Sequence, residues 1–418
     1  MPAAKTRTNF TFPGANRPKF KPNAKKLANG RREKPRWWDF VATGAISFSV
    51  DSDGVIGALP VRLDYTSARY RTAVGLLLAF AALNISTGQE REPRATSQLG
   101  LQTSHRFTFS EAHMGTMFRI VLYAPDATTA EKAFRGAFDR IAALDNTMSD
   151  YKPDSELTRL SRGAGGPPVK VSEDLFQVLA AAQELAARSG GAFDVTVGPL
   201  VRLWRRARRR HELPDRTRQA QALALVGYRN LLLDPRHRTA QLLKPGMLLD
   251  LGGIAKGYAA DEALSVLKRD GLTSALVAAA GDIVCSRPPP GRESWRIEIA
   301  APAPSTQSAD KRARYLLLHD AAVSTSGDAE QHLDVGGQRY SHIINPATGM
   351  ALTGRRSVTV VAPRGITADS YAVAVCVLGP KRGLELIDST DGTSALIVES
   401  SGRGFQYFES KRALPYTN

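Results

Sequence analysis

The sequence predicts an α+β fold with mixed, largely antiparallel sheets and packed helices. From about Arg106 onward, strand-like and helix-like segments are interleaved, without the strict repetition of a doubly wound sheet or a barrel. Hydrophobic residues make up 43% of the 418 residues, which is enough to build a substantial core. Because this length exceeds one ordinary domain, we expect one large domain with additional material.

The expected elements follow the hydrophobic pattern along the chain. Helices are predicted over 129–144, 173–188, from about 255 onward, and over 366–378. Strands are predicted at 107–110, 118–124, 248–250, 274–278, 295–300, 314–318 and 358–361. The first two strands flank Met114-Gly115-Thr116, and a surface loop is expected within the Pro- and Ser-rich stretch 288–308.

The chain is expected to have three parts: a basic, disordered extension over 1–68, a signal-like apolar segment and linker over 69–104, and a folded domain over 105–418. Its net charge is +16, but the first hundred residues hold 16 of the 56 Lys and Arg and only 7 of the 40 Asp and Glu. More than half of the positive excess therefore belongs to the region before the domain. The domain itself shows no motif or aromatic spacing typical of a nucleic-acid reader.

The segment 69–104 has the order of a secretory signal. Arg69 and Arg71 precede an apolar stretch over 73–83, and Ala79-Phe80-Ala81 offers a small-x-small cleavage site. The stretch is too short to span a bilayer as a helix. We expect an exported protein, periplasmic or associated with the inner membrane, whose natural start lies downstream of Met1. The alternative is an apolar linker helix in a cytoplasmic protein.

Cysteine and arginine usage narrows the function classes. Cys285 and Cys376 are the only cysteines, which excludes a disulfide scaffold, a four-cysteine zinc site and a four-cysteine iron–sulfur cluster. Both lie in apolar runs and are expected to be inert buried thiols. The Arg-rich run 205–210 after Trp204 is interpreted as a solvated loop. The alternative is a surface that attracts anionic lipid or an acidic partner.

The segment 248–258 is the first with chemical content. It places Asp250 before Gly252-Gly253 and puts Lys256 in the first turn of the following helix. Glycines at a helix entrance let the backbone approach a phosphate or a metal, and the helix N-terminus favours negative charge. A glycine turn that only connects two elements is the alternative.

Asp369 and His342 are the other chemical candidates. Asp369 lies near the start of an apolar helix that should be buried, where an unpaired carboxylate is costly. It therefore either caps that helix or binds a metal. His342, at a strand end before Asn345-Pro346, is suited to accept a proton near neutral pH, or it is a simple hydrogen-bonding residue.

Together these segments resemble the ApbE family of FAD:protein FMN transferases in kind, order and approximate spacing. The resemblance covers about 106–410. Further matching motifs are Met114-Gly115-Thr116, Met148-Ser149-Asp150-Tyr151, the stretches 153–157 and 190–200, and Ser324-Thr325-Ser326-Gly327-Asp328. Each motif alone is weak, and their joint occurrence is specific.

The resemblance implies an architecture related to the tunnelling fold, with FAD in a cleft between its parts. It implies flavin-nucleotide contacts at eight positions: Met114, Tyr151, Ala192, Phe193, Asp194, Asp250, Lys256 and Ile344. It also implies metal binding by the backbone carbonyl of Gly253 and the carboxylate of Asp369, with Mg²⁺ as the usual metal. His342 and Asp369 are the catalytic candidates, and either His342 or a nearby carboxylate is the candidate base.

The implied reaction transfers FMN from FAD to a Thr or Ser hydroxyl of a target protein and releases AMP. Targets of the family are membrane-associated electron-transfer proteins. The chain departs from the family pattern at Val373, where Thr is common, at Asn345, where Asp is usual, and at Ala280, where glycine is favoured. The alternatives are an FAD pyrophosphate hydrolase that gives FMN and AMP, and a noncatalytic FAD-binding protein.

Overall fold

The computed structural model describes residues 47–50, 55–59, 104–299, 314–327, 331–401 and 404–416. The signal-like stretch and nearly all of the basic extension lie outside these ranges. Two short strands, β1 (Ser47–Val50) and β2 (Val55–Leu59), fall within 1–68, and β2 pairs in parallel with β10 (Trp295–Ile299). None of the helices in the described ranges combines the length and the apolar character needed to cross a membrane.

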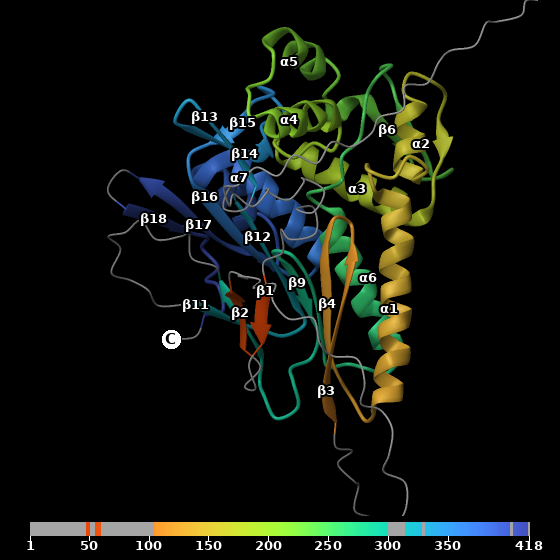
Figure 1. Cartoon of the computed structure of the whole chain (residues 1–418), viewed down its shortest axis with the longest axis vertical. Coiled ribbons are helices and arrows are strands. Elements are labelled where there is room, and N and C mark those ends of the chain that lie inside the picture. Colours follow the sequence, from red (N-terminus) through yellow and green to blue (C-terminus); the bar gives the residue numbers. More distant parts are fainter. Residues whose placement is uncertain are drawn as a thin grey trace, which may run out of the picture. The chain divides into compact units, whose positions relative to one another are not determined.

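An eight-stranded sheet forms the centre of the domain (Figure 1). Every neighbouring pair in it is antiparallel. In spatial order the strands are β18 (Gly404–Glu409), β17 (Ser394–Ser401), β16 (Arg356–Ala362), β12 (Ala321–Gly327), β9 (Asp282–Cys285), β8 (Ala275–Ala279), β4 (Thr116–Ala124) and β3 (His105–His113).

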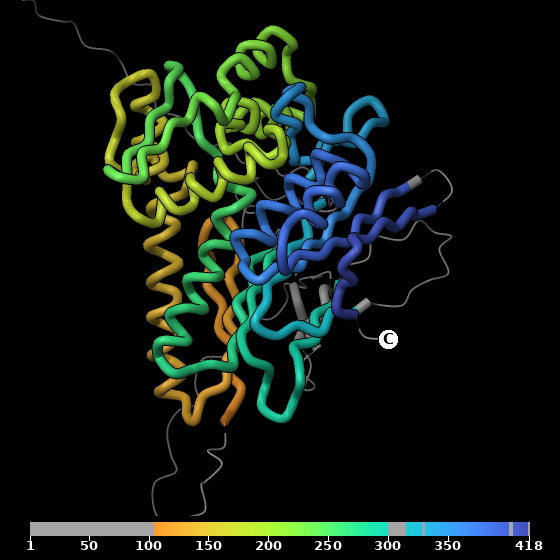
Figure 2. Tube along the Cα trace, turned by 180° about the vertical axis from the view of Figure 1, so that it is seen from behind, coloured from red at the N-terminus to blue at the C-terminus, as the bar shows by residue number. Residues whose placement is uncertain are grey.

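Three long helices pack on one face of this sheet: α1 (Ala127–Met148), α6 (Ala255–Arg269) and α7 (Gly365–Asp388). Figures 1 and 2 show α1 and α6 side by side. Asp126 starts α1 by accepting a hydrogen bond from the Thr129 N–H at 2.8 Å, as an N-cap does. The helix α7 bends at Gly379, whose φ is 76°, just before Pro380.

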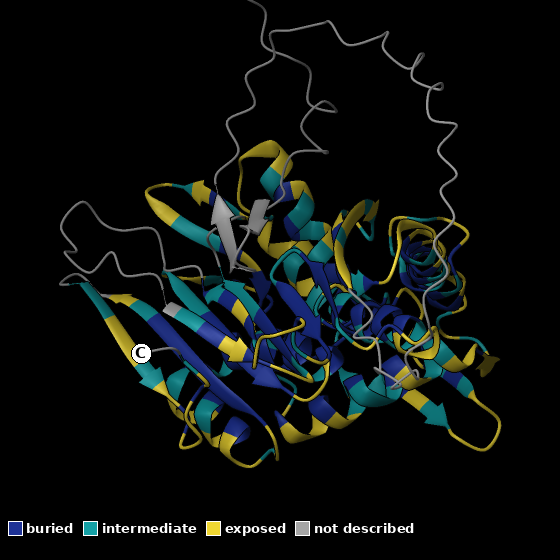
Figure 3. Ribbon diagram, turned by 90° about the horizontal axis from the view of Figure 1, so that it is seen from below, coloured by how far each residue is buried: buried dark blue, intermediate teal, exposed yellow. Residues whose placement is uncertain are grey.

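The opposite face of the sheet is covered by the pair β10 and β11 (Arg314–Leu318). Alternation along β4 serves both faces, because Ile120 and Leu122 enter the helix-side core whereas Val121 packs toward Trp295 and its neighbours. Figure 3 shows the resulting band of buried strands through the middle of the domain. The central sheet is therefore enclosed on both sides.

Smaller elements complete the domain. One three-stranded sheet has the order β5 (Val169–Lys170), β7 (Thr239–Leu242) and β6 (Leu231–Asp234), and another contains β13 (His332–Val335), β14 (Gln338–Ile344) and β15 (Ala351–Thr353). The other helices are α2 (Glu156–Arg162), α3 (Glu173–Arg188), α4 (Gly198–Arg210), α5 (Arg216–Leu223) and the 3₁₀ turn Tyr228–Asn230. A separate small core lies between α4 and the sheet of β13–β15.

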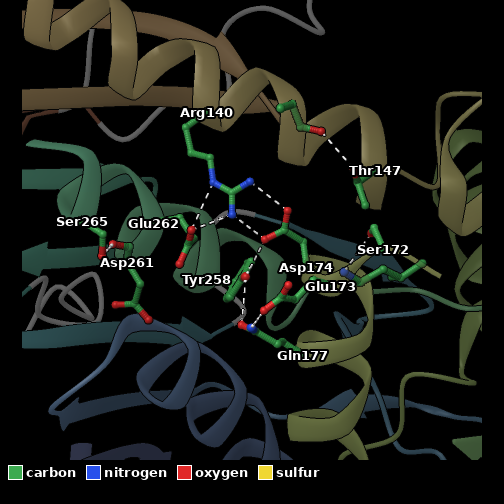
Figure 4. Close-up of polar contacts among 12 residues, drawn as sticks. Arg140, Thr147, Ser172, Glu173, Asp174, Gln177, Tyr258, Asp261, Glu262 and Ser265 are labelled. Atoms are coloured by element: carbon green, nitrogen blue, oxygen red, sulfur yellow. Dashed lines mark hydrogen bonds and ion pairs between the residues drawn. The ribbon is translucent and has the colours of Figure 1, made fainter. Parts of the chain in front are cut away.

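Arg140 of α1 links three helices (Figure 4). Its guanidinium donates to Asp174 Oδ2 of α3 at 2.8 Å and to Glu262 Oε2 of α6 at 2.6 Å. The Tyr258 hydroxyl of α6 donates to the same Asp174 carboxylate at 2.7 Å. This network fixes α6 against α1 and α3, and α6 begins with the residues that line the candidate site.

The predicted fold class and most of the predicted elements are confirmed. The predicted helix 173–188 coincides with α3, and the predicted strands at 107–110, 118–124, 274–278, 295–300, 314–318 and 358–361 correspond to β3, β4, β8, β10, β11 and β16. The predicted strand 248–250 is wrong, because Leu248 forms only an isolated bridge with Val197. The Arg-rich run 205–210 belongs to α4 and not to a loop. Both cysteines are buried, as predicted.

Candidate active site

One cavity of about 490 Å³ brings together all the residues singled out from the sequence. Its size falls in the range typical of small-molecule sites. The β3–β4 turn, the end of α1, the start of α6 and the first half of α7 contribute to it, as do β12 and β14. The predicted residues that line it are Met114, Tyr151, Ala192, Phe193, Asp194, Asp250, Gly253, Lys256, His342, Ile344 and Asp369.

A close crossing of two helices forms one wall. At the crossing, Gly257 of α6 touches Gly365 of α7: a Cβ on Gly257 would lie 2.1 Å from the Gly365 carbonyl oxygen. Only glycine therefore allows the two backbones to approach this closely. Asp261 of α6 accepts hydrogen bonds from the N–H groups of Gly365 and Ile366, at 2.6 and 3.1 Å. The crossing places Lys256 of α6 beside Asp369 of α7.

Lys256 lies between two buried carboxylates. Its Nζ is 3.2 Å from Asp282 Oδ2 and 3.5 Å from Asp369 Oδ2, and it donates to the Gly252 carbonyl at 2.9 Å. Burial, followed by the charge of Asp282, raises the pKa of Asp369 to about 7, although Lys256 opposes this shift. Burial lowers the pKa of Lys256, but the two carboxylates outweigh it and hold the pKa above its ordinary value.

Asp369 does not cap its own helix, so that interpretation was wrong. The N-terminus of α7 is satisfied by Asp261, and the Asp369 Oδ2 instead accepts the Gly257 N–H of α6 at 3.1 Å. The reason is geometric: the glycine crossing brings α6 within hydrogen-bond distance of the fifth residue of α7. The Asp369 side chain therefore points across the helix interface and into the cavity wall.

The donor set here fits a hard divalent cation. Asp282 and Asp369 face a single lysine, so a cation is needed for both carboxylates to be ionised and compensated. Carboxylate and carbonyl oxygens are the donors that Mg²⁺ prefers. Gly253 is close to this cluster, because a Cβ on it would lie 3.0 Å from Cγ2 of Val373, one turn after Asp369. No group of three or more His, Cys, Asp or Glu in the described ranges is arranged to hold a metal. A backbone carbonyl or ligand oxygens would have to complete the coordination.

Arg205 organises a second charged group in the cavity. Its guanidinium bonds the carboxylate of Asp150 and donates to Asp250 Oδ2 at 2.9 Å. Burial lowers the pKa of Arg205, but the charges of Asp250 and Asp150 outweigh it and raise the pKa. The guanidinium also lies 4.5 Å from the centre of the Tyr151 ring, a cation–π distance, and Tyr151 itself is 70% exposed.

Asp194 lies in the cavity wall but is already fully engaged. Its carboxylate accepts hydrogen bonds from the Thr196 N–H, the Thr196 hydroxyl and the Tyr228 N–H, at 2.8, 2.7 and 2.7 Å. Asp194 is 6% exposed, and burial raises its pKa despite these three donors. These bonds fix the loop that carries Ala192 and the buried Phe193. Whether these residues contact a flavin nucleotide is still a prediction.

His342 lies within β14, two residues before the strand ends, and its ring is open to the cavity. The cavity surface exposes this residue, but the cavity itself lies deep in the protein, so protein atoms surround the ring. This depth, followed by the charge of Arg208, lowers the pKa of His342 to about 4. The imidazole is therefore neutral at pH 7 and has a nitrogen that can accept a proton.

Among the cavity residues that were not proposed as site residues from the sequence are Asp150, Arg205, Arg208 and Asp282, which supply charges described above. Asp150 and Asp282 lie next to recognised motif residues, so the signal was present. The two arginines were assigned to a solvated run. Each follows an apolar residue of α4 by four positions, Val201 for Arg205 and Trp204 for Arg208, whereas Arg206 and Arg209 follow arginines at that spacing. This pattern is the signal that separates the two pairs.

Comparison with known proteins shows the family of this chain. The model of the ApbE family matches residues 114–397. The chain belongs to the ApbE family. A relative from Treponema pallidum (strain Nichols), named FAD:protein FMN transferase, is 33% identical over 70% of this chain and 84% of its own. One of the same name from Klebsiella pneumoniae (strain 342) is 30% identical over 71% and 85%. The structure titled flavin transferase ApbE from Vibrio cholerae has a TM-score of 0.66 at 29% identity, over 74% of this chain and 98% of its own.

The structure explains two departures from the ApbE pattern. Ala280 has a φ of 53°, the left-handed region that glycine adopts without strain, which explains why glycine is favoured there. Asn345 accepts a hydrogen bond from the Ala347 N–H through Oδ1 at 2.9 Å, so the amide supplies the acceptor that an aspartate would supply. These two changes leave the cavity walls intact.

Proposed function

We propose that this ApbE-family chain transfers FMN from FAD to a Thr or Ser hydroxyl of an acceptor protein and releases AMP. The observation that carries the proposal is the single cavity that joins the flavin-nucleotide positions to the buried cluster of Lys256, Asp282 and Asp369. A cation held beside two carboxylates at the wall of a nucleotide-sized cavity suits phosphoryl chemistry. The family names of its relatives support the same assignment.

In this reaction the acceptor oxygen attacks the FMN-side phosphorus, and the bond from that phosphorus to the bridging oxygen breaks. AMP leaves with the bridging oxygen, and the hydroxyl proton passes to a base. His342 is the proposed base, because it lines the cavity and its low pKa keeps it neutral at pH 7. Lys256, whose raised pKa keeps it protonated, supplies a fixed positive charge near the pyrophosphate.

The Gly253 carbonyl and the Asp369 carboxylate would hold Mg²⁺. When bound, the ion neutralises charge on the phosphate oxygens. Val373 has no hydroxyl to add to this set, so the chain offers one oxygen fewer than the family pattern. Tyr151, exposed and backed by Arg205, presents a ring face on which an aromatic part of the dinucleotide can stack.

We further propose that the protein is exported and acts on a membrane-associated electron-transfer protein in the periplasm. The support is the signal-like order of charged, apolar and polar residues over 69–104. N-terminal sequencing of the mature protein tests this. A start within 80–104 is expected, and a mature chain that retains residues from the first fifty would overturn it.

Mass spectrometry of an acceptor fragment tests the transferase. The fragment is incubated with the purified protein, FAD and Mg²⁺, and its mass is expected to rise by one FMN less one water. Asp369→Ala should abolish the increase, whereas Glu385→Ala, an exposed carboxylate on the same helix, should leave it unchanged. Free FMN plus AMP without modified fragment would instead identify a pyrophosphate hydrolase. Intact, bound FAD would identify a binding protein.

A further inference from the structure

Two arginines on the same face of α4 line the cavity but have different surroundings. Arg205 is bonded to Asp150 and Asp250. Arg208, one turn later, has a single polar partner within the part of the chain that the structure describes, the neutral Gln331 Oε1 at 3.4 Å. Within the described ranges, Arg205 is therefore compensated by carboxylates, whereas Arg208 is not.

The position of Arg208 makes this lack of compensation costly. The side chain is partly buried, and burial, followed by the charge of Arg205, lowers its pKa. A guanidinium stays protonated even so, because its ordinary pKa is far above neutral. A partly desolvated cation without a counter-ion is stabilised by an anion that enters the site. The charge of Arg208 also lowers the pKa of His342, so the two side chains lie in the same part of the cavity.

We propose that Arg208 is a phosphate-binding residue of this cavity, donating from its guanidinium to an oxygen of the FAD pyrophosphate. The inference rests on the proposed function, which places FAD in the cavity. The planar fork of a guanidinium matches phosphate oxygens, and a charged bond of this kind is among the stronger polar contacts. The neighbouring Arg209 and Arg210 are exposed and do not line the cavity. They are therefore not part of this site.

The phosphate of FAD is favoured over an acidic side chain of the acceptor because Arg208 lies inside the cavity with His342 and Lys256. Lys256 is already paired with Asp282 and Asp369. Arg355, which also lines the cavity, has no carboxylate partner among the described residues either, but of these two arginines it is Arg208 whose charge acts on His342. Arg208 is therefore a cavity cation whose charge is uncompensated among those residues. An incoming dianionic pyrophosphate meets it without first breaking an ion pair.

The test is ligand binding by the full-length protein, measured by calorimetry with FAD, ADP and riboflavin. Arg208→Gln should weaken FAD binding by about tenfold to a hundredfold, the range for a hydrogen bond to a charged group. Riboflavin carries no phosphate, so its affinity should not change. Arg208→Lys should recover part of the loss, and Arg209→Gln, on the exposed face of α4, should bind FAD as the wild type does. ADP reports whether the adenosine-side phosphates make the contact.

Two results would overturn the proposal. Equal weakening of FAD and riboflavin would mean that Arg208 only supports the cavity wall. Unchanged FAD binding, with transfer to the acceptor reduced, would mean that Arg208 recognises the acceptor protein instead. The readout is separate from the transferase assay: wild-type protein that binds FAD but modifies no acceptor refutes the transferase, while the comparison of FAD with riboflavin still decides the function of Arg208.

Discussion

The strained residue Ala280 gives the sharpest test of the structure. It lies with Gly281 in the two-residue turn between β8 and β9, where Ala279 pairs with Asp282, and its φ is 53°. A left-handed conformation costs a non-glycine residue about 1–2 kcal/mol. Glycine removes that strain, but it also makes the unfolded chain more flexible, and the additional entropy lost on folding cancels about 0.4–1 kcal/mol of the gain in stability. We therefore expect Ala280→Gly to raise the free energy of unfolding by about 0.8 kcal/mol, the midpoint of a range from about 0 to about 1.6 kcal/mol.

Equilibrium urea unfolding of Ala280→Gly and Ala279→Gly measures this directly. Ala279 is the matched control, because it is fully buried within β8. Glycine there loses a buried methyl group and gains only flexibility, so that variant should be less stable by about 1 kcal/mol or more. The reasoning would be refuted if both variants lost stability to a similar degree. Ala280→Gly should also keep its FAD affinity, because Gly281 still fixes the approach of the turn to Thr325.

Three further predictions follow from the helix packing and from His342. Gly257→Ala should destabilise the fold by about 3 kcal/mol or more in the same urea assay, because its Cβ would overlap the Gly365 carbonyl. The control is Gly136→Ala in α1, where a Cβ has ordinary space; this variant should be neutral or stabilising. Arg140→Leu should cost about 2–3 kcal/mol at pH 7, since two carboxylates lose their shared cation. Burial raises the pKa of Asp174, but hydrogen bonds from Arg140 and Tyr258 outweigh it and hold the pKa below its ordinary value, so the cost should shrink at acid pH as Asp174 takes up a proton. At saturating Mg²⁺, which would hold Asp369 ionised despite its pKa of about 7, the kcat/KM of transfer should stay flat down to about pH 5. The reason is that His342, with a pKa of about 4, is neutral above that value and protonated only below it.

Each of these has a clear contrary result. A Gly257→Ala protein as stable as the wild type would mean that α6 and α7 are farther apart than described. A pH-independent effect of Arg140→Leu would show that lost packing, and not the carboxylates, causes it. An acid limb of kcat/KM near pH 6.5 that persists at saturating Mg²⁺ would mean that the imidazole has its ordinary pKa in the free enzyme or that another group is the base.

Local pattern was sufficient for many elements of this fold. The helix 173–188 could be predicted because a serine N-cap, first-turn acids and an apolar face all agree. The segment 248–250 was wrongly predicted as a strand for a physical reason. An apolar run that ends in a carboxylate is also typical of a buried loop, and Leu248 forms only one isolated bridge, with Val197, that does not extend into a ladder. The hydrophobic pattern of a segment does not show whether another strand runs beside it and pairs with it.

For the site, the sequence indicated which residues gather but not how they are paired. Asp369 was expected to need a partner, and the choice between a cap and a ligand depended on the approach of α6, which is set by two glycines over a hundred residues apart. Arg205 and Arg208 looked alike as members of one basic run. The folded structure shows that, among the described residues, the first is paired with carboxylates and the second is not.

The pairing of β4 with β8 has a consequence for how the chain folds. These neighbours are separated in sequence by the stretch that contains α1 to α6, so β4 has its inner partner only after residue 279 has been synthesised. Contacts between such distant segments slow folding, because a long loop must close before they form. A nascent chain that stops earlier leaves β4 as an apolar edge with unpaired backbone groups. Truncated products of this protein should therefore aggregate rather than persist as soluble fragments. Chaperone binding should be strongest during synthesis, after β4 has emerged and before β8 is available to pair with it.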